Sequence, residues 1–189
     1  ENLVDLHEAL REMHFPHDAD KKETALSRLK FDEFFLHQLL HGKVRRELKK
    51  QKSPAIPFDE KIVQAAIKEL PFVLTDAQKK ALWAIIKDME RSEPMNRLLE
   101  GDVGTGKTLV AALAARNAAA QGWQTAMLAP TEILAAQHGQ TLLKFFKGQM
   151  RTAVFTRTKR FIDGVEVTKA QMLDALANSK VDLVVGTHA

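Results

Sequence analysis

Gly101-Asp102-Val103-Gly104-Thr105-Gly106-Lys107-Thr108 is the stretch of sequence that decides the fold. It fits G-x-x-x-x-G-K-[ST], a loop that cradles phosphate groups between a strand and the helix that follows. Its glycines let backbone N–H groups turn toward phosphate oxygens, and the helix beginning near Lys107 adds the positive end of its dipole. Lys107 can reach the β and γ phosphates and the Thr108 hydroxyl can join the shell of Mg²⁺, so both are candidate catalytic residues. The loop predicts a site for a nucleotide and Mg²⁺.

Two other interpretations of this loop are weaker. A glycine-rich turn with a surface lysine does not explain the Lys-Thr pair at this spacing. The dinucleotide fingerprint G-x-G-x-x-G would require a third glycine, and that position is Leu109.

Helices and strands alternate on both sides of the loop, from Pro71 onward. Apolar periodicity and turn residues predict helices over 75–89, from about 107 to 122, over 131–146 and over 168–177, and strands over 97–100, 125–129, 151–155 and 181–185. Nearly continuous apolar strands in this alternation are typical of a parallel sheet covered by helices on both faces. The sequence therefore predicts an α/β fold.

Residues 1–70 have the pattern of a helical region. Asn2 can cap a first helix, and a longer helix is expected over 26–49. The phenylalanines of the longer helix recur at four-residue spacing, which is more typical of a core than of a surface that stacks on bases. After a proline-containing break, Asp59 can cap a short helix. We expect a helical connector over 1–70 and an α/β domain over 71–189.

Composition excludes several classes of protein. The 189 residues are 45% hydrophobic, include no cysteine, and carry 28 Lys and Arg against 24 Asp and Glu, a formal charge of +4. This mixture favours a packed core over disorder, and no apolar run approaches the ~18 residues of a membrane span. Disulfides and thiolate zinc sites are excluded. Because the chain opens on Glu1 and has no targeting segment, we expect it to be a piece of a larger protein.

Positive charge is concentrated in two runs. His41–Lys52 holds six basic residues against one acidic residue, and Lys144–Arg160 holds six with none. The rest of the chain is net acidic, so the runs suit a polyanionic partner. Either run taken alone also fits a solvated helix face or loop.

Gln78 allows two roles. In Thr75-Asp76-Ala77-Gln78 it completes a capping box, in which Thr75 accepts from the Gln78 N–H and the Gln78 side chain accepts from the Thr75 N–H. Its amide also offers the donor and acceptor needed to bind an adenine edge. The residues alone favour the cap.

Four stretches carry a resemblance to a known family: Leu74–Gln78, Pro94–Glu100 running into the phosphate loop, Ala129–His138 and Asp182–Ala189. They resemble the superfamily 2 helicases, and most closely the RecG-type ATP-dependent DNA helicases, which also place a basic helical connector before the first motor lobe. The transcription-repair coupling translocase is the nearest alternative, but 96–100 and 131–134 look more like RecG. The resemblance implies the front part of a RecA-like lobe after a helical connector.

The resemblance also implies a site and partners. Gln78 would read the adenine of ATP, and Gly101 to Thr108 would hold the triphosphate and Mg²⁺. The DNA backbone would lie along five residues at strand ends: Pro130, Thr131, Gly186, Thr187 and His188. The implied partner is branched DNA, such as stalled forks and Holliday junctions, in the bacterial cytoplasm at the nucleoid, with no membrane. The intact enzyme is expected to be a monomer, although the sequence leaves oligomeric state open, and Thr131 equally fits a helix cap.

Departures from the family pattern limit this transfer. Asp76 stands in place of a glycine, Thr105 in place of a serine, and 156–158 reads Thr-Arg-Thr in place of Thr-Gly-Ser, so the family's DNA contacts are not carried over to that last loop. The acidic Walker B pair and the second motor lobe are not in the chain. We expect residues 1–189 alone to bind nucleotide weakly without turnover.

Two alternatives come from other classes. One is a P-loop switch or small-molecule kinase with no nucleic-acid role, whose ATPase should not respond to DNA. In the other, the helical region is only a spacer. Replacing Lys43, Arg45, Arg46, Lys49 and Lys50 by glutamine should then leave DNA affinity unchanged.

Overall fold

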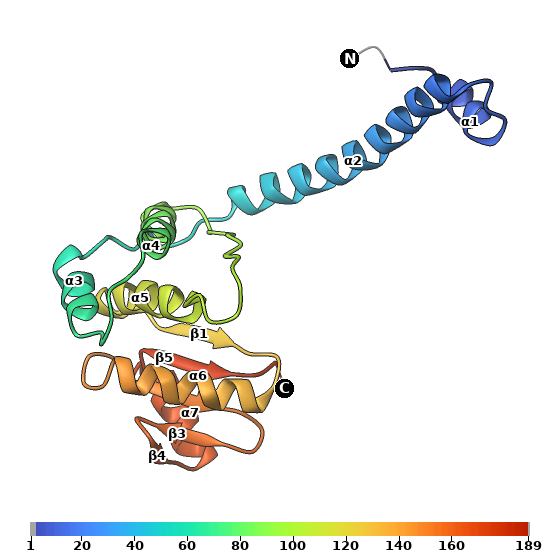
Figure 1. Ribbon diagram of the computed structural model, residues 1–189. Helices are drawn as coiled ribbons and strands as arrows, with labels where there is room; N and C mark the ends of the chain where they lie inside the picture. The colour runs from blue at the N-terminus through green and yellow to red at the C-terminus, as the bar shows by residue number, and fades with distance from the viewer. Residues whose placement is uncertain (1–2, 189) are drawn as a thin grey trace. The chain divides into compact units, whose positions relative to one another are not determined.

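The computed structural model describes residues 3–188, which divide into two compact units between Lys52 and Ser53. In the first unit, α1 (Leu6–His14) packs against α2 (Ala19–Lys50) (Figure 1). The carboxylate of Asp5 caps α1, accepting from the His7 N–H at 2.8 Å, and Asp18 caps α2. The cap expected at Asn2 lies outside the described residues, and α1 begins four residues later because Asp5 supplies the acceptor.

The apolar stripe of α2, which includes Phe35 and Leu39, is exposed to solvent. The sequence had led us to expect these side chains to pack in a core. Phe35 is 52% exposed and Leu39 is 54% exposed. In the first unit, the described residues bury only Ala9, Glu12 and Ala25. Small side chains at the α1 contact allow the helices to approach, but α1 has nine residues and is too short to cover the 32 residues of α2.

The second unit contains the α/β fold. Its helices are α3 (Glu60–Lys68), α4 (Asp76–Met89), α5 (Lys107–Ala120), α6 (Glu132–Phe145) and α7 (Lys169–Ala177), and its strands are β1 (Thr125–Leu128), β2 (Thr152–Phe155), β3 (Arg160–Ile162), β4 (Val165–Glu166) and β5 (Leu183–Gly186). Threonine side chains at 75, 131 and 168 cap α4, α6 and α7 by accepting from the third N–H of each helix. None of the helices in the described part of the chain has the length and apolar character needed to cross a bilayer.

The sheet is mixed, with strand order β1-β5-β2-β3-β4. β5 lies between β1 and β2 and is parallel to both, as expected. β3 and β4 are antiparallel additions that were not among the strands expected from the sequence. They join at Asp163-Gly164, where both residues have positive φ (49° and 83°), as a two-residue hairpin turn requires.

The prediction of a strand over 97–100 is wrong. These residues have no regular secondary structure, and no described strand pairs with them. Apolar residues favour extended backbone, but a strand needs a neighbour that exchanges hydrogen bonds with it. Leu99 still packs against the core of the second unit.

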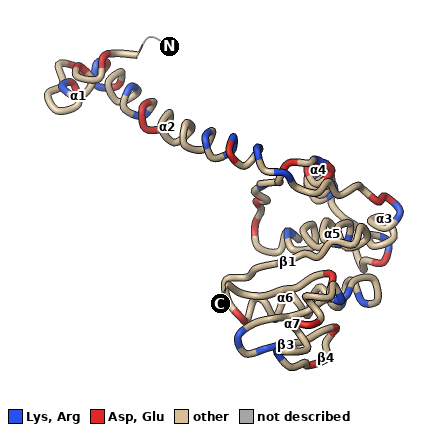
Figure 2. The backbone as a smooth tube through the Cα atoms, turned by 180° about the vertical axis from the view of Figure 1, so that it is seen from behind, with Lys and Arg blue, Asp and Glu red and all other residues tan. Residues whose placement is uncertain are grey.

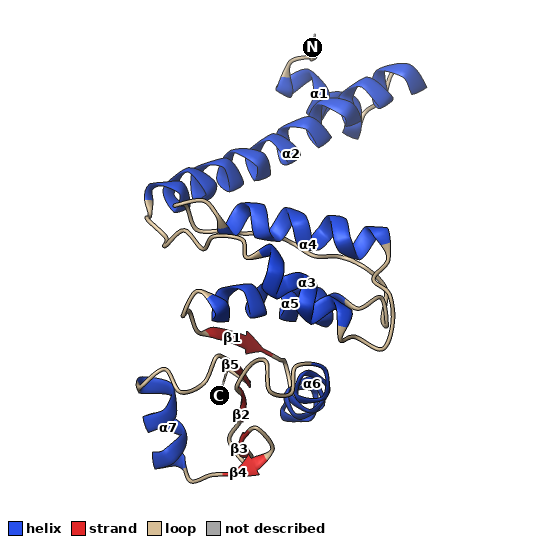
Figure 3. Cartoon of the chain, turned by 90° about the vertical axis from the view of Figure 1, so that its left-hand side faces the viewer, coloured by secondary structure: helices blue, strands red, loops and turns tan. Residues whose placement is uncertain are grey.

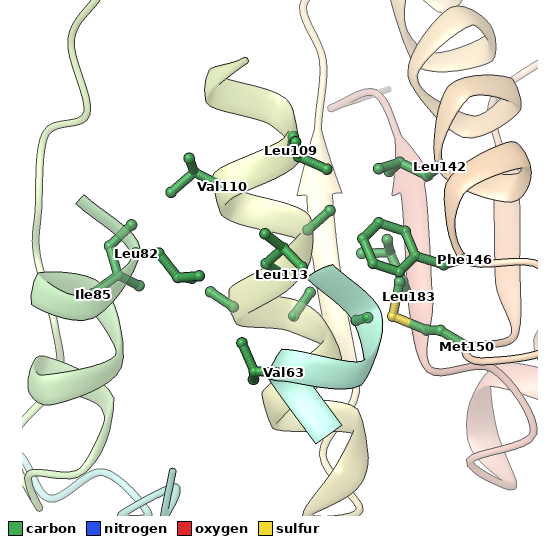
Figure 4. Packing of buried hydrophobic residues seen from close by; sticks show 14 of the residues in the cluster. Val63, Leu82, Ile85, Leu109, Val110, Leu113, Leu142, Phe146, Met150 and Leu183 are labelled. Atoms are coloured by element: carbon green, nitrogen blue, oxygen red, sulfur yellow. The ribbon is translucent and has the colours of Figure 1, made fainter. Parts of the chain in front are cut away.

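Helices cover the sheet on both faces. Figure 3 shows α6 on one side of the strands and α7 on the other. The larger core joins α3, α4, α5, α6 and β5, with Leu113, Leu142 and Phe146 fully buried in its interior (Figure 4). β2 and β5 are mostly buried, whereas β1 alternates between partly buried and exposed positions. That alternation is expected of a strand at the sheet edge, covered on one face.

The helix α3 belongs to this core. Val63 and Ala66 on α3 and Leu70 just after it are buried in the same cluster as α5. Residues 53–70, which the sequence analysis placed with the helical connector, therefore pack within the second unit.

Candidate nucleotide-binding site

The phosphate loop leads directly into α5. Gly104 and Gly106 have φ of 87° and 81°, in the left-handed region where a Cβ is strained. Gly101 is needed for another reason, because a Cβ there would lie 2.7 Å from the Thr105 hydroxyl. Thr105, in place of the family's serine, keeps that hydroxyl and donates it to the Asp102 carbonyl at 2.9 Å. The loop conformation thus depends on its three glycines.

The first turn of α5 has free N–H donors. Gly106 occupies the cap position and provides no side-chain acceptor, unlike the threonines that cap α4, α6 and α7. Uncapped N–H groups at the positive end of a helix dipole favour an anion. The loop is exposed from Gly101 to Thr105 and becomes partly buried from Gly106 onward.

The Lys107 ammonium is held by the loop itself. Its Nζ donates to the carbonyl oxygens of Gly101 at 2.6 Å and Asp102 at 2.7 Å. The side chain therefore curls over the loop toward the place where phosphate would lie. A lysine ammonium rotates freely among acceptors, so it can exchange these carbonyls for phosphate oxygens.

Gln78 connects α4 to the phosphate loop. Its Oε1 accepts from the Thr75 N–H at 2.9 Å, and Thr75 Oγ1 accepts from the Gln78 N–H, so the capping box is confirmed. Its Nε2 also donates to the Thr105 carbonyl at 2.9 Å. A Cβ on Gly106 would lie only 2.5 Å from this Nε2, so glycine is required for the contact. Gln78 therefore forms the capping box and at the same time lies beside the phosphate loop, where its amide could also meet an adenine edge.

Thr108 follows on the first turn of α5 and is partly buried. Because Thr108 directly follows Lys107, its hydroxyl is suited to be a ligand of a Mg²⁺ ion bound to the phosphates. Within residues 3–188 the structure contains no group of three or more His, Asp or Glu that could hold a metal by itself.

The strand-end residues come together beside this site. Leu128 and Gly186 are register partners, and the Ala129 N–H donates to the Gly186 carbonyl at 2.8 Å, which places Pro130 and Thr131 next to Thr187 and His188. The N-terminal end of α5 lies at the same end of the sheet (Figure 4).

The individual strand-end residues differ in their surroundings. Pro130, Thr131 and His188 are exposed. The Thr131 hydroxyl caps α6 by accepting from the Leu134 N–H at 3.2 Å. Gly186 is buried, and a Cβ there would lie 2.5 Å from the Phe155 carbonyl. The buried Thr187 hydroxyl has no hydrogen-bond partner among the described residues.

The second basic run does not form one patch. The Thr158 hydroxyl donates to the Glu132 carboxylate, so the N-terminus of α6 lies beside the end of β2 and the two elements run in opposite directions. Lys144 and Lys147, near the other end of α6, are therefore separated from Arg157 and Lys159. Figure 2 shows the two groups of basic residues at different ends of the sheet.

Sequence reasoning missed Asn117. It is fully buried on α5, and its side chain bonds to the backbone of Pro57 and Asp59. A buried asparagine in an alanine-rich helix gives little local signal, because its partners lie about 60 residues away. The β3–β4 hairpin, in contrast, could have been predicted from the sequence, because the Asp-Gly pair at its turn strongly favours a hairpin.

Comparison with known proteins identifies the family. The family model described as DEAD/DEAH box helicase matches residues 75–189, which include the phosphate loop and the strand ends described above. The chain belongs to the DEAD/DEAH box helicase family. This membership decides against the switch and kinase alternative.

Relatives of this helicase chain share most of its length. It is 39% identical over 183 residues to the ATP-dependent DNA helicase RecG of Streptococcus pneumoniae, covering 96% of this chain and 26% of the relative. The RecG of Thermotoga maritima is also 39% identical, over 99% of this chain and 24% of the relative. The chain thus spans about a quarter of the length of these relatives.

A solved structure of RecG bound to a three-way DNA junction matches 95% of this helicase chain and 24% of that protein, with a TM-score of 0.81 and 39% identity. The resemblance to the RecG type is confirmed, and it includes the helical residues before the α/β fold. The RecA-like α/β fold is confirmed as well.

Proposed function

We propose that this chain forms the ATP-binding front part of a RecG-type DNA helicase that acts on branched DNA. The phosphate loop carries the proposal: Gly104 and Gly106 are in left-handed conformations, the N–H groups of α5 are uncapped, and Lys107 Nζ is over the loop. The RecG relatives support ATP and DNA as ligands.

Each residue of the loop has a role in this proposal. The N–H groups of Gly101 to Thr108 bind the phosphates, Lys107 neutralises the β and γ phosphates, and Thr108 is a ligand of Mg²⁺. When bound, Mg²⁺ supplies charge neutralisation for phosphoryl transfer. Gln78 binds the adenine edge with the remaining capacity of its amide, since Nε2 carries a second hydrogen and Oε1 a second lone pair.

The strand ends form the proposed DNA surface. Pro130, Thr131, Gly186, Thr187 and His188 would follow the phosphate backbone, which carries no base sequence. The Thr187 hydroxyl, which has no hydrogen-bond partner within residues 3–188, supports this role, because a buried polar group without a partner costs stability unless a ligand satisfies it. Selectivity would then depend on DNA shape, as suits a protein that acts on forks and junctions in a bacterial cell.

Fluorescent ATP binding to residues 1–189 tests the nucleotide site. Lys107→Ala should weaken binding at least about tenfold, because a charged hydrogen bond to phosphate is lost. Lys61→Ala is the matched control, since Lys61 is an exposed lysine on α3. Equal binding by wild type and Lys107→Ala would overturn the assignment of this loop. In the intact helicase, forked DNA should stimulate ATP hydrolysis, and Lys107→Ala should abolish the stimulated rate.

A further inference from the structure

Residues 53–59 form a segment without regular secondary structure, here named the strap, which leads from the end of α2 to the start of α3. The strap contacts two helices, α4 and α5. These are the two helices whose first turns carry Gln78 and Lys107. The strap is held near the opposite ends of both helices.

On α5 the strap is fixed by Asn117, which is 0% exposed. Asn117 Oδ1 accepts from the Asp59 N–H at 2.8 Å, and its Nδ2 donates to the Pro57 carbonyl at 3.0 Å. A buried amide is tolerated only when its polar atoms are paired, and here both partners are strap backbone groups. Asn117 lies ten residues after Lys107, about 15 Å along one continuous helix.

On α4 the strap is fixed to the last turn and the residues just after it. The Ser53 N–H donates to the Ser92 carbonyl at 2.9 Å, and the Ile56 N–H donates to the Met89 carbonyl at 2.8 Å. The Phe58 ring packs edge-on against Trp83, with ring centroids 5.6 Å apart. The strap therefore has backbone attachments to α4 that are independent of Asn117.

The other ends of the two helices meet at the phosphate loop. There the Gln78 amide on α4 donates to the Thr105 carbonyl, one residue before the cap of α5. The α4–α5 pair is thus connected at one end by the phosphate loop and at the other by the strap. A ligand that displaced the Thr105 carbonyl would act on both helices, because Gln78 joins them at this point, and rigid helices would carry the displacement to their other ends.

We propose that the strap responds to nucleotide bound at the phosphate loop, with Asn117 as the positioning residue that fixes the strap to α5. This inference rests on the proposed function, because it requires ATP to bind at residues 101–108. It assigns a role to a buried polar residue that lies outside the proposed nucleotide and DNA sites.

Hydrogen exchange of residues 1–189, with and without ATP and Mg²⁺, tests the inference. ATP should slow exchange at 101–108, and it should change exchange of the strap amides of Ser53, Ile56 and Asp59 at least threefold, since these amides are hydrogen-bonded to α4, to α5 or to the residues just after α4. Protection at 101–108 with an unchanged strap would overturn the inference and leave the proposed function standing. No protection at 101–108 would overturn both.

Substitution of Asn117 tests its specific role. Asn117→Ala should speed exchange of the Asp59 amide about tenfold without ATP, as expected for one lost hydrogen bond. It should keep ATP protection at 101–108 and abolish the response of the Asp59 amide, the strap amide that bonds to Asn117. A purely structural role would raise exchange but leave the ATP response intact, which would overturn the assignment of Asn117.

Two further variants complete the test. Ile56→Pro removes the N–H that bonds to Met89 without altering α5, so it should also reduce the strap response, and it replaces Asn117→Ala if that variant does not fold. Asn178→Ala is the matched control, because the hydrogen bonds of Asn178 in the described part of the chain stay within the end of α7. It should respond to ATP like wild type.

Discussion

The first unit and the second unit differ in how they stabilise their helices. In the first, α1 and α2 depend on carboxylate caps and on a small contact around Ala9 and Ala25, and the apolar stripe of α2 remains exposed. In the second, α5 is surrounded by α3, α4, α6 and β1, and most of its side chains are buried. Helix formation in the first unit is therefore a local property, whereas in the second it depends on tertiary packing.

This difference separates the parts of the chain that carry ligand chemistry from those that do not. The phosphate loop requires strained glycine conformations, and these persist only where surrounding structure fixes them. The core beneath α5 provides that support. The first unit has no comparable core and, among its described residues, no such strained position.

The largest contrast should appear for leucine-to-alanine substitutions. Leu113→Ala removes a fully buried side chain from α5 and should destabilise the second unit by about 2–5 kcal/mol. Leu39→Ala, at a position that is 54% exposed on α2, should cost less than about 0.5 kcal/mol. Both tryptophans of the chain, Trp83 and Trp123, lie in the second unit, so their fluorescence during denaturant unfolding measures the effect of Leu113→Ala. Circular dichroism of the same samples follows the helices of the first unit and measures the effect of Leu39→Ala. Equal losses of stability for the two variants, each in its own unit, would contradict the contrast.

Glycine-to-alanine substitutions should have opposite signs in the two units. Gly106→Ala places a Cβ in a left-handed conformation, 2.5 Å from Gln78 Nε2, and should destabilise the second unit by about 1–2 kcal/mol while weakening ATP binding. Gly42→Ala, inside α2 with no atom within 4 Å of the added Cβ, should stabilise the first unit by about 0.5–1 kcal/mol. Thermal melting by circular dichroism measures both, and a destabilising Gly42→Ala would show that α2 is not limited by helix propensity.

The smallest expected effect is on the stability of the first unit at acid pH. In the first unit, the His17 N–H donates to the Glu12 carboxylate at 3.0 Å, and this bond, with help from the His17 side chain, lowers the pKa of Glu12 below its ordinary value of 4.5. A lowered pKa contributes stability that is present above pH 4.5 and is lost as the pH falls through the pKa of the folded state.

Glu12→Gln should therefore flatten the pH dependence of the first unit below pH 4.5. The comparison is made by circular dichroism melts of both proteins from about pH 3 to pH 7. Tryptophan fluorescence of the second unit provides the internal control, since its acid response should be the same in wild type and variant. An unchanged pH profile in the first unit would show that the His17 contact does not contribute to folding.

Local signals in the sequence predicted much of the fold and site. The phosphate loop, the capping box of Gln78 and the caps at Asp59 and Thr131 all depend on residues within a few positions of one another. The three parallel strands followed from apolar runs of the right length. Such features are predictable because their partners are near in sequence.

Features that depend on distant partners were not predicted. Residues 97–100 are apolar enough for a strand, but whether they form one is decided by a neighbouring strand. The Asn117 contacts join residues about 60 positions apart. The run Lys144–Arg160 reads as one basic cluster in the sequence, yet a reversal of chain direction separates its two halves.

The hydrogen bonds of Lys107 to Gly101 and Asp102 have a consequence for ligand affinity. Because the ammonium already restrains the loop carbonyls, less conformational freedom is lost when a ligand arrives, and the loop is preorganised. The arriving phosphate must, in return, replace two existing partners of the lysine. Measured affinity is then the difference between two sets of contacts, so the strength of a single lysine–phosphate pair overstates it.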